Sequence, residues 1–218
     1  MKLYSYFRSS ASYRVRIALN LKNLPFDVVP VHLLKNGGEQ FAPEYRNLNP
    51  DALVPALIDE AADNPAALTQ SLAIIEYLEE THPQPALLPK NPADRAFVRS
   101  LALSIACEIH PLNNLRVLRY LVRDLKVDEE SKSAWYRHWC EQGLAALEAT
   151  LARDDRVGKF CFGDTPTLAD CCLVPQIANA QRFNSDLSKM PTIMRINETC
   201  LALDAFQKAA PANQPDAE

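Results

Sequence analysis

Serines and arginines gather near the start of the chain, in the run Arg8-Ser9-Ser10-Ala11-Ser12-Tyr13-Arg14-Val15-Arg16. The run follows an apolar, strand-forming segment and opens a segment with helical periodicity. The first turn of a helix carries unpaired backbone N–H groups and the positive end of the helix dipole, so it favours an anion. The run therefore indicates a site for a thiolate or a carboxylate, although serines at a helix start very often act only as caps.

Two further segments of the N-terminal half could bind a ligand. Val54-Pro55 heads an apolar strand, and proline supplies no N–H to a sheet. A cis bond before Pro55 would present the N–H and C=O groups of Val54 to an extended peptide, in the manner of strand addition. Gln70-Ser71 opens a helix, where free N–H groups and the Ser71 hydroxyl suit a carboxylate. A thiolate site, a peptide-backbone site and a carboxylate site together describe glutathione.

The elements that must position these residues alternate between strand and helix over residues 1–82. Strands are expected at 2–6, 26–31, 53–58 and 67–69, and helices at 11–22, at 39–46 and from Ser71 onward. The β-α-β-α-β-β-α order contains a parallel β-α-β unit and a closing hairpin, an α/β layout on one sheet. Arg14 and Arg16 face different sides of the first helix and are expected to form structural ion pairs.

A proline-rich stretch at 83–92 separates this region from the rest of the chain. Prolines at that density do not fit inside a helix and predict a linker. Beyond it the pattern is helical throughout, with helices expected at 93–122, 130–154, 167–182 and 190–205. The predicted organisation is an α/β domain at 1–82, a linker at 83–92 and an all-helical domain at 93–218, with a frayed tail at its end.

Three local signals mark the helical half. Thr167-Leu168-Ala169-Asp170 has the form of a capping box, which predicts a structural role at a helix start. Pro111 lies within a helical pattern and predicts a bend lined by His110, Asn113 and Asn114, which either faces a ligand cleft or is a solvated kink. Arg182 ends a predicted helix and serves either a ligand or a surface ion pair.

Composition excludes several classes of protein. The formal net charge of −4 over 218 residues, without a basic stripe, argues against a general nucleic-acid binder. The N-terminus lacks a signal-peptide pattern, and no apolar run approaches the roughly 20 residues of a membrane span, so we expect a soluble, cytoplasmic protein without membrane partners. The six cysteines form no C-x-x-C pair and the four histidines no ligand spacing, so no metal site is expected.

The N-terminal half resembles the thioredoxin-like domain of glutathione transferases at Val54-Pro55 and Gln70-Ser71. Residues 8–19 resemble the signature of the zeta class, which includes maleylacetoacetate and maleylpyruvate isomerases. The likeness extends over almost the whole chain, through residues 49–57, 109–114, 163–170 and 180–183.

This resemblance implies a glutathione transferase fold: an α/β thioredoxin-like N-terminal domain followed by an all-α domain. It implies a homodimer and a glutathione-dependent cis–trans isomerisation of a maleyl-type diacid, with glutathione recycled as cofactor. The catalytic residues implied are Ser9, credited with activating the thiol, with Ser10, Arg8 and Arg182, the arginines binding the substrate's carboxylates. The cofactor-binding residues implied are Ser9, Val54, Pro55, Gln70, Ser71, His110 and Asn114.

One departure from the zeta pattern is Ala11, which stands where the class usually has cysteine. Its presence puts thiol–disulfide side reactions in doubt and slightly favours the maleylpyruvate enzymes, which also lack that cysteine. The substrate stays open between maleylacetoacetate, from tyrosine and phenylalanine breakdown, and maleylpyruvate, from gentisate breakdown. A transferase that conjugates electrophiles and a non-catalytic interaction protein of the same fold are the alternatives.

Overall fold

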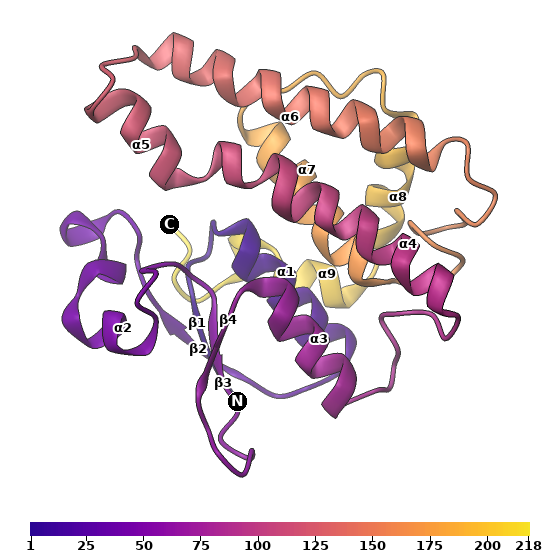
Figure 1. Cartoon of the computed structure of the whole chain (residues 1–218), viewed down its shortest axis with the longest axis horizontal. Helices are drawn as coiled ribbons and strands as arrows, with labels where there is room; N and C mark the ends of the chain where they lie inside the picture. The colour runs from indigo at the N-terminus through magenta and orange to yellow at the C-terminus, as the bar shows by residue number, and fades with distance from the viewer. The chain divides into compact units, whose positions relative to one another are not determined.

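The computed structural model describes the whole chain, residues 1–218, as two compact units (Figure 1). The first unit comprises Met1–Leu87 together with Ala202–Glu218, and the second comprises Leu88–Leu201. The C-terminal segment thus packs in the first unit, whereas the sequence predicts it as part of the helical domain at 93–218.

The first unit contains a four-stranded mixed sheet in the order β2-β1-β3-β4. Strand β1 runs parallel to β2 and antiparallel to β3, which is antiparallel to β4. Its elements are β1 (Lys2–Ser5), α1 (Ser10–Leu21), β2 (Asp27–Pro30), α2 (Pro43–Leu48), β3 (Ala56–Ile58), β4 (Ala67–Thr69) and α3 (Ser71–Thr81), with 3-10 turns at Lys35–Gly37 and Glu39–Phe41. The parallel β-α-β unit and the closing hairpin predicted from periodicity are confirmed.

Apolar residues of the sheet and of two helices form a core in the first unit. Leu3 of β1 and Leu57 of β3 are fully buried, as are Ile17 of α1 and Leu78 of α3. Helices α1 and α3 pack against each other, which fixes the start of each helix relative to the sheet. A side chain of this size gains about 1.5–3 kcal/mol on full burial, so the core holds the helix starts firmly.

The C-terminal segment carries α9 (Asp204–Ala209) and a 3-10 turn at Pro211–Asn213. Figure 1 shows α9, in yellow, beside the indigo α1, and the two helices are in contact. Asn20 Nδ2 donates to the Ala205 carbonyl at 3.0 Å, and Gln214 is buried. The frayed tail expected over about the last eight residues is therefore wrong: within it Gln214 is buried, and Asp216 Oδ2 accepts a hydrogen bond from the distant Phe7 N–H at 3.0 Å.

The second unit is helical throughout. Its elements are α4 (Pro92–Leu103), a π-helical segment at Ser104–Ile109, a 3-10 turn at Pro111–Asn113, α5 (Leu115–Arg123), α6 (Glu129–Leu151), α7 (Leu168–Arg182) and α8 (Pro191–Leu201). The single helix expected at 93–122 is instead divided, since the helix type changes at Ser104 and Pro111 lacks an N–H group. The helix expected at 190–205 is likewise divided into α8 and α9.

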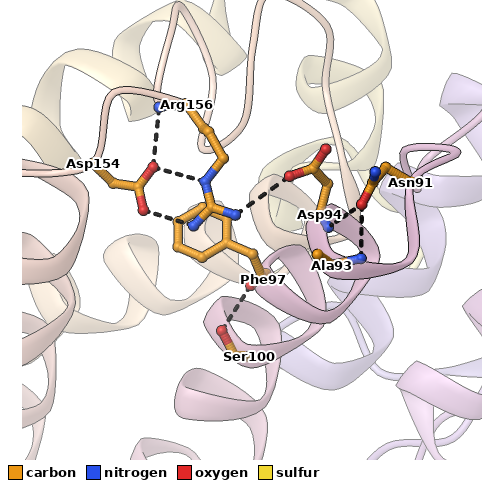
Figure 2. Close-up of polar contacts among 7 residues, drawn as sticks. All are labelled: Asn91, Ala93, Asp94, Phe97, Ser100, Asp154 and Arg156. Carbon is orange, nitrogen blue, oxygen red and sulfur yellow. Dashed lines mark hydrogen bonds and ion pairs between the residues drawn. The ribbon is translucent and has the colours of Figure 1, made fainter.

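An exposed arginine fixes the long connection between α6 and α7 (Figure 2). Arg156 pairs with Asp154 at 2.7 Å and with Asp94 of α4 at 3.3 Å, and its guanidinium lies 3.7 Å from the centroid of the Phe97 ring. Hydrogen bonds from Arg156 lower the pKa of Asp154 to about 2. The same close-up shows the Asn91 side chain capping the first turn of α4.

The start of α7 is organised by Asp170. Its Oδ2 atom accepts hydrogen bonds from the backbone N–H and the hydroxyl of Thr167, both at 2.8 Å, and its Oδ1 atom accepts from the Cys161 N–H at 2.9 Å. Burial raises the pKa of Asp170 above the ordinary value. The predicted capping box is confirmed.

Candidate active site

Three chain segments leave the sheet of the first unit at the same end of its strands. Tyr4 of β1 pairs with Ala56 of β3, which pairs with Thr69 of β4. Because β3 is antiparallel to both neighbours, the segment after β1, the segment before β3 and the segment after β4 all emerge beside this row. The structure therefore brings together the three segments in which the sequence predicted ligand-binding groups.

Ser9 is the N-cap of α1. Its Oγ atom accepts a hydrogen bond from the Ser12 N–H at 3.2 Å, and its own N–H donates to the Tyr6 carbonyl at 2.9 Å. The hydroxyl proton is still available to an anion, because a serine oxygen can accept and donate at once. Ser9 is half-buried whereas Ser10 is only 5% exposed. Of the two predicted catalytic serines, Ser9 is thus the more accessible.

Arg8 precedes Ser9 and is exposed. Its guanidinium lies 4.8 Å from the centroid of the Phe7 ring, and Phe7 itself is buried. Stacking on an aromatic face restrains the position of a guanidinium and leaves its N–H groups free to bind a carboxylate in a bidentate manner.

The Val54-Pro55 peptide bond is cis. Both residues lie before β3, outside its paired positions, so Val54 takes no part in the strand ladder. The preceding carbonyl, of Leu53, accepts hydrogen bonds from the Tyr45 hydroxyl at 2.6 Å and from Asn49 Nδ2 at 2.7 Å. Burial raises the pKa of Tyr45 to about 12, so its hydroxyl stays a donor at neutral pH.

Tyr45 and Asn49 are positioning residues that sequence reasoning did not assign. The signal for Asn49 was the dipeptide Asn49-Pro50, which stands shortly before Val54. No local pattern marks Tyr45, because its hydroxyl reaches Leu53 only once α2 has packed on the sheet.

Gln70 adopts a positive φ of 67° and is the N-cap of α3, without a side-chain hydrogen bond to the helix. The first backbone N–H groups of α3 thus have no side-chain cap, which suits a carboxylate. Ser71 is buried, and its Oγ atom lies 3.3 Å from Nη1 of the buried Arg14. Arg14 adds positive charge behind this helix start.

Arg16 differs from the expectation of an ion pair. Its guanidinium is fully buried and donates to main-chain carbonyls and to the Ser5 hydroxyl. Carbonyls that end a strand need donors when they are buried, and this requirement, not a carboxylate, fixes the side chain.

His110, Asn114 and Arg182 belong to the second unit. His110 Nε2 lies 3.4 Å from Asn114 Nδ2, and Asn114 Oδ1 caps α5 by accepting from the Arg116 N–H at 3.1 Å. Asn113 points inward instead, donating to the Tyr136 carbonyl at 3.2 Å, so it supports the bend and does not line it.

Arg182 is the last residue of α7 and is exposed. Its guanidinium lies 4.9 Å from the centroid of the Phe183 ring, which stacks on Tyr136 at 3.7 Å. Arg8 in the first unit and Arg182 in the second are therefore both cations supported by a phenylalanine ring.

Other kinds of site receive no support from the side chains. No group of three or more His, Cys, Asp or Glu residues is placed to hold a metal ion. All six cysteines are free thiols, and only Cys107 is exposed. None of the helices combines the length and the hydropathy that a membrane span requires.

Comparison with known proteins shows which family this chain resembles. The N-terminal domain of glutathione S-transferases matches residues 3–86, and the C-terminal domain matches residues 140–195. The chain is 52% identical over 215 residues to a probable maleylacetoacetate isomerase of Vibrio cholerae, covering 99% of this chain and 97% of the relative.

Two solved structures extend the comparison. A holo maleylpyruvate isomerase described as a bacterial zeta-class glutathione transferase is 50% identical, with a TM-score of 0.95 and full coverage of both chains. A maleylacetoacetate isomerase of Methylobacterium extorquens, with bound malonate and glutathione, is 42% identical, with a TM-score of 0.94 and full coverage of both chains. The chain belongs to the zeta class of the glutathione S-transferase family.

The two units accordingly form the thioredoxin-like and helical parts of a glutathione transferase fold. Glutathione is the cofactor of this family, and the residues at this end of the sheet in the first unit fit glutathione. They offer a hydroxyl at the positive dipole end of α1, the backbone of Val54 outside the strand ladder and a helix start at Ser71 without a side-chain cap.

Proposed function

We propose that this zeta-class enzyme is a glutathione-dependent cis–trans isomerase of maleyl-type diacids, converting maleylacetoacetate to fumarylacetoacetate. The observation that carries the proposal is Ser9, a half-buried hydroxyl at the N-terminus of α1, within a chain about half identical to isomerases over nearly all of its length.

Bound glutathione supplies a thiolate, whose reversible addition to a conjugated alkene turns the double bond into a single bond that rotates. The Ser9 hydroxyl donates a hydrogen bond to the sulfur and, with the α1 dipole, favours the thiolate over the thiol. Ser10 supports the same helix start. Arg8 and Arg182 bind the two carboxylates of the diacid and stabilise the negative charge that develops beside its carbonyl group.

The remaining predicted residues bind the cofactor. The N–H and C=O groups of Val54, turned by Pro55, hold the peptide backbone of glutathione as an added strand does. Gln70 and Ser71 bind a carboxylate at the start of α3. We assign His110 and Asn114 as further contacts from the second unit.

The natural diacid is either maleylacetoacetate or maleylpyruvate, since both place a maleyl group next to a keto function. Similarity to isomerases of both kinds supports either choice, and the malonate bound by the Methylobacterium relative is also a dicarboxylate. We further propose a cytoplasmic homodimer acting in tyrosine and phenylalanine breakdown or in another aromatic pathway.

The first experiment measures turnover of both maleyl diacids at catalytic glutathione concentrations and weighs the product. Isomerisation with unchanged product mass is expected. A glutathione adduct with a generic electrophile, without isomerisation, would move the protein to the conjugating transferases. Absence of both reactions would favour a non-catalytic binding protein.

Ser9→Ala removes one donor to the developing charge, and we expect about a 10²-fold loss of turnover. Ser10→Ala, one position away in a more buried setting, is the matched comparison and is expected to lose less. Steady-state kinetics at saturating glutathione measure both, and unchanged turnover in Ser9→Ala would refute the assignment.

Arg182→Ala removes a carboxylate contact, so we expect a higher KM for the diacid with glutathione affinity nearly unchanged. Arg195→Ala removes another exposed arginine of the second unit and serves as the control. A weakened affinity for glutathione alone would show that Arg182 is wrongly placed in the reaction.

A further inference from the structure

The peptide groups of Phe7 are held from both sides by charged side chains. The Phe7 N–H donates to Asp216 Oδ2 at 3.0 Å, and the Phe7 carbonyl accepts from Arg16 Nη2 at 3.0 Å. Asp216 comes from the C-terminal segment, 209 positions away, and Arg16 from α1. Phe7 is only 3% exposed and is followed directly by Arg8 and Ser9.

Arg16 ties three parts of the first unit together with one guanidinium. Besides Phe7, it donates from Nη1 to Ser5 Oγ at 3.0 Å and from Nε to the Ala209 carbonyl at 2.9 Å. Burial lowers the pKa of Arg16 to about 10, so the group keeps its charge at neutral pH. A planar fork of donors suits this task, which a lysine cannot reproduce.

We propose that Arg16 and Asp216 form a clamp on the Phe7 backbone that positions Ser9 and Arg8 for catalysis. The proposal rests on the proposed function, in which Ser9 contacts the glutathione sulfur. A displacement of about 1 Å in a reacting group can cost 10²-fold in rate, so a loop that carries both residues has to be fixed. The clamp acts through the backbone, and neither residue touches substrate.

The C-terminal segment has other anchors, which make the clamp separable from the fold. Asn20 binds the Ala205 carbonyl at 3.0 Å, Arg16 binds that of Ala209, and Phe206 is fully buried. Removal of the Asp216 carboxylate therefore releases the Phe7 N–H without releasing α9.

The test compares Asp216→Ala and Asp216→Asn with Asp204→Ala. Asp204 lies in the same segment, is 84% exposed at its side chain and pairs only with Lys208, so it is a matched control. The readouts are kcat, KM, affinity for glutathione by calorimetry, and the thiol pKa of bound glutathione from the ultraviolet absorbance of its thiolate.

For Asp216→Ala we expect kcat to fall about tenfold and the bound thiol pKa to rise, with glutathione affinity changed less than about twofold. Asp216→Asn keeps an acceptor and should lie between this variant and the wild type. Arg16→Lys should show the same signature more strongly if it folds, but the Asp216 variants carry the test.

An unchanged thiol pKa and kcat in Asp216→Ala, or an equal loss in Asp204→Ala, would overturn the clamp. The thiol titration also separates this proposal from the proposed function. A wild type that lowers the thiol pKa without isomerising any diacid would refute the isomerase alone, and the Asp216 variants would still confirm or refute the clamp. A wild type that leaves the thiol pKa at its solution value would overturn the clamp.

Discussion

The two units of this protein differ in the buried charges that bind unpaired main-chain groups: the first unit uses cations together with Glu79, which accepts the Leu87 N–H at 2.9 Å, and the second unit uses anions. In the first unit the buried cations Arg16 and Lys22 collect main-chain carbonyls. In the second unit the buried anions Asp170 and Glu148 collect main-chain N–H groups. The sign follows from the backbone: carbonyls are unpaired where strands and helices end, and N–H groups are unpaired where helices begin.

One charge from each unit illustrates this rule. Lys22 donates to the carbonyls of His82 at 2.8 Å and Pro85 at 3.0 Å, just beyond the end of α3. Glu148 accepts from the N–H groups of Thr192 at 3.0 Å and Ile193 at 2.8 Å, in the first turn of α8. The buried charges are thus a consequence of where the chain must turn inside each unit.

The largest expected effect on stability comes from removing a buried cation of the first unit. Lys22 also pairs with the buried Glu79 at 2.7 Å, and Lys22→Met leaves that carboxylate without its cation, at an expected cost of about 3–5 kcal/mol in the free energy of unfolding. Urea denaturation measures the loss. Lys2→Met, which breaks the exposed pair with Glu60, is the matched control and should change stability little.

The buried anions are tested by Asp170→Ala, which removes the acceptor of three donors: the Thr167 N–H and hydroxyl at the start of α7 and the Cys161 N–H before it. We expect a loss of about 2–4 kcal/mol in the free energy of unfolding, because each buried unsatisfied group is costly. Asp128→Ala removes the exposed cap of α6 and should lose less. Equal losses in the two variants would show that burial of the charge adds nothing.

The smallest effect on stability is expected from the exposed ion pairs of Arg156, because they are solvated whereas the charges of Lys22 and Asp170 are buried. The pKa of Asp154 is lowered to about 2, so the stabilisation is present above the ordinary pKa of Asp and is lost as the pH falls through about 2. Thermal unfolding should show Arg156→Ala less stable than wild type at neutral pH, with the difference shrinking in acid. Arg153→Ala, an exposed neighbour, should show no such pH dependence.

Local signals in the sequence were enough to identify much of the candidate site. Ser9, Val54-Pro55 and Gln70-Ser71 could be found because helix starts and proline positions depend on residues close in sequence. The parallel β-α-β unit and the closing hairpin followed from the same alternation of periods, whereas the order of the strands in the sheet came from the structure. Accessibility did not follow, and Ser9 and Ser10 became distinguishable only when their burial was known.

By itself, therefore, the sequence determined the parallel β-α-β unit with its closing hairpin, most of the helix starts and three candidate ligand-binding segments, since each is set by short-range capping, turn chemistry and periodicity. Only the tertiary structure decided that Arg16 binds carbonyls, that the helix expected at 93–122 is divided, and that the C-terminal segment returns to the first unit. The physical reason is distance along the chain: Phe7 and Asp216 are 209 positions apart, and only packing of α9 on α1 brings a carboxylate to the backbone beside Ser9.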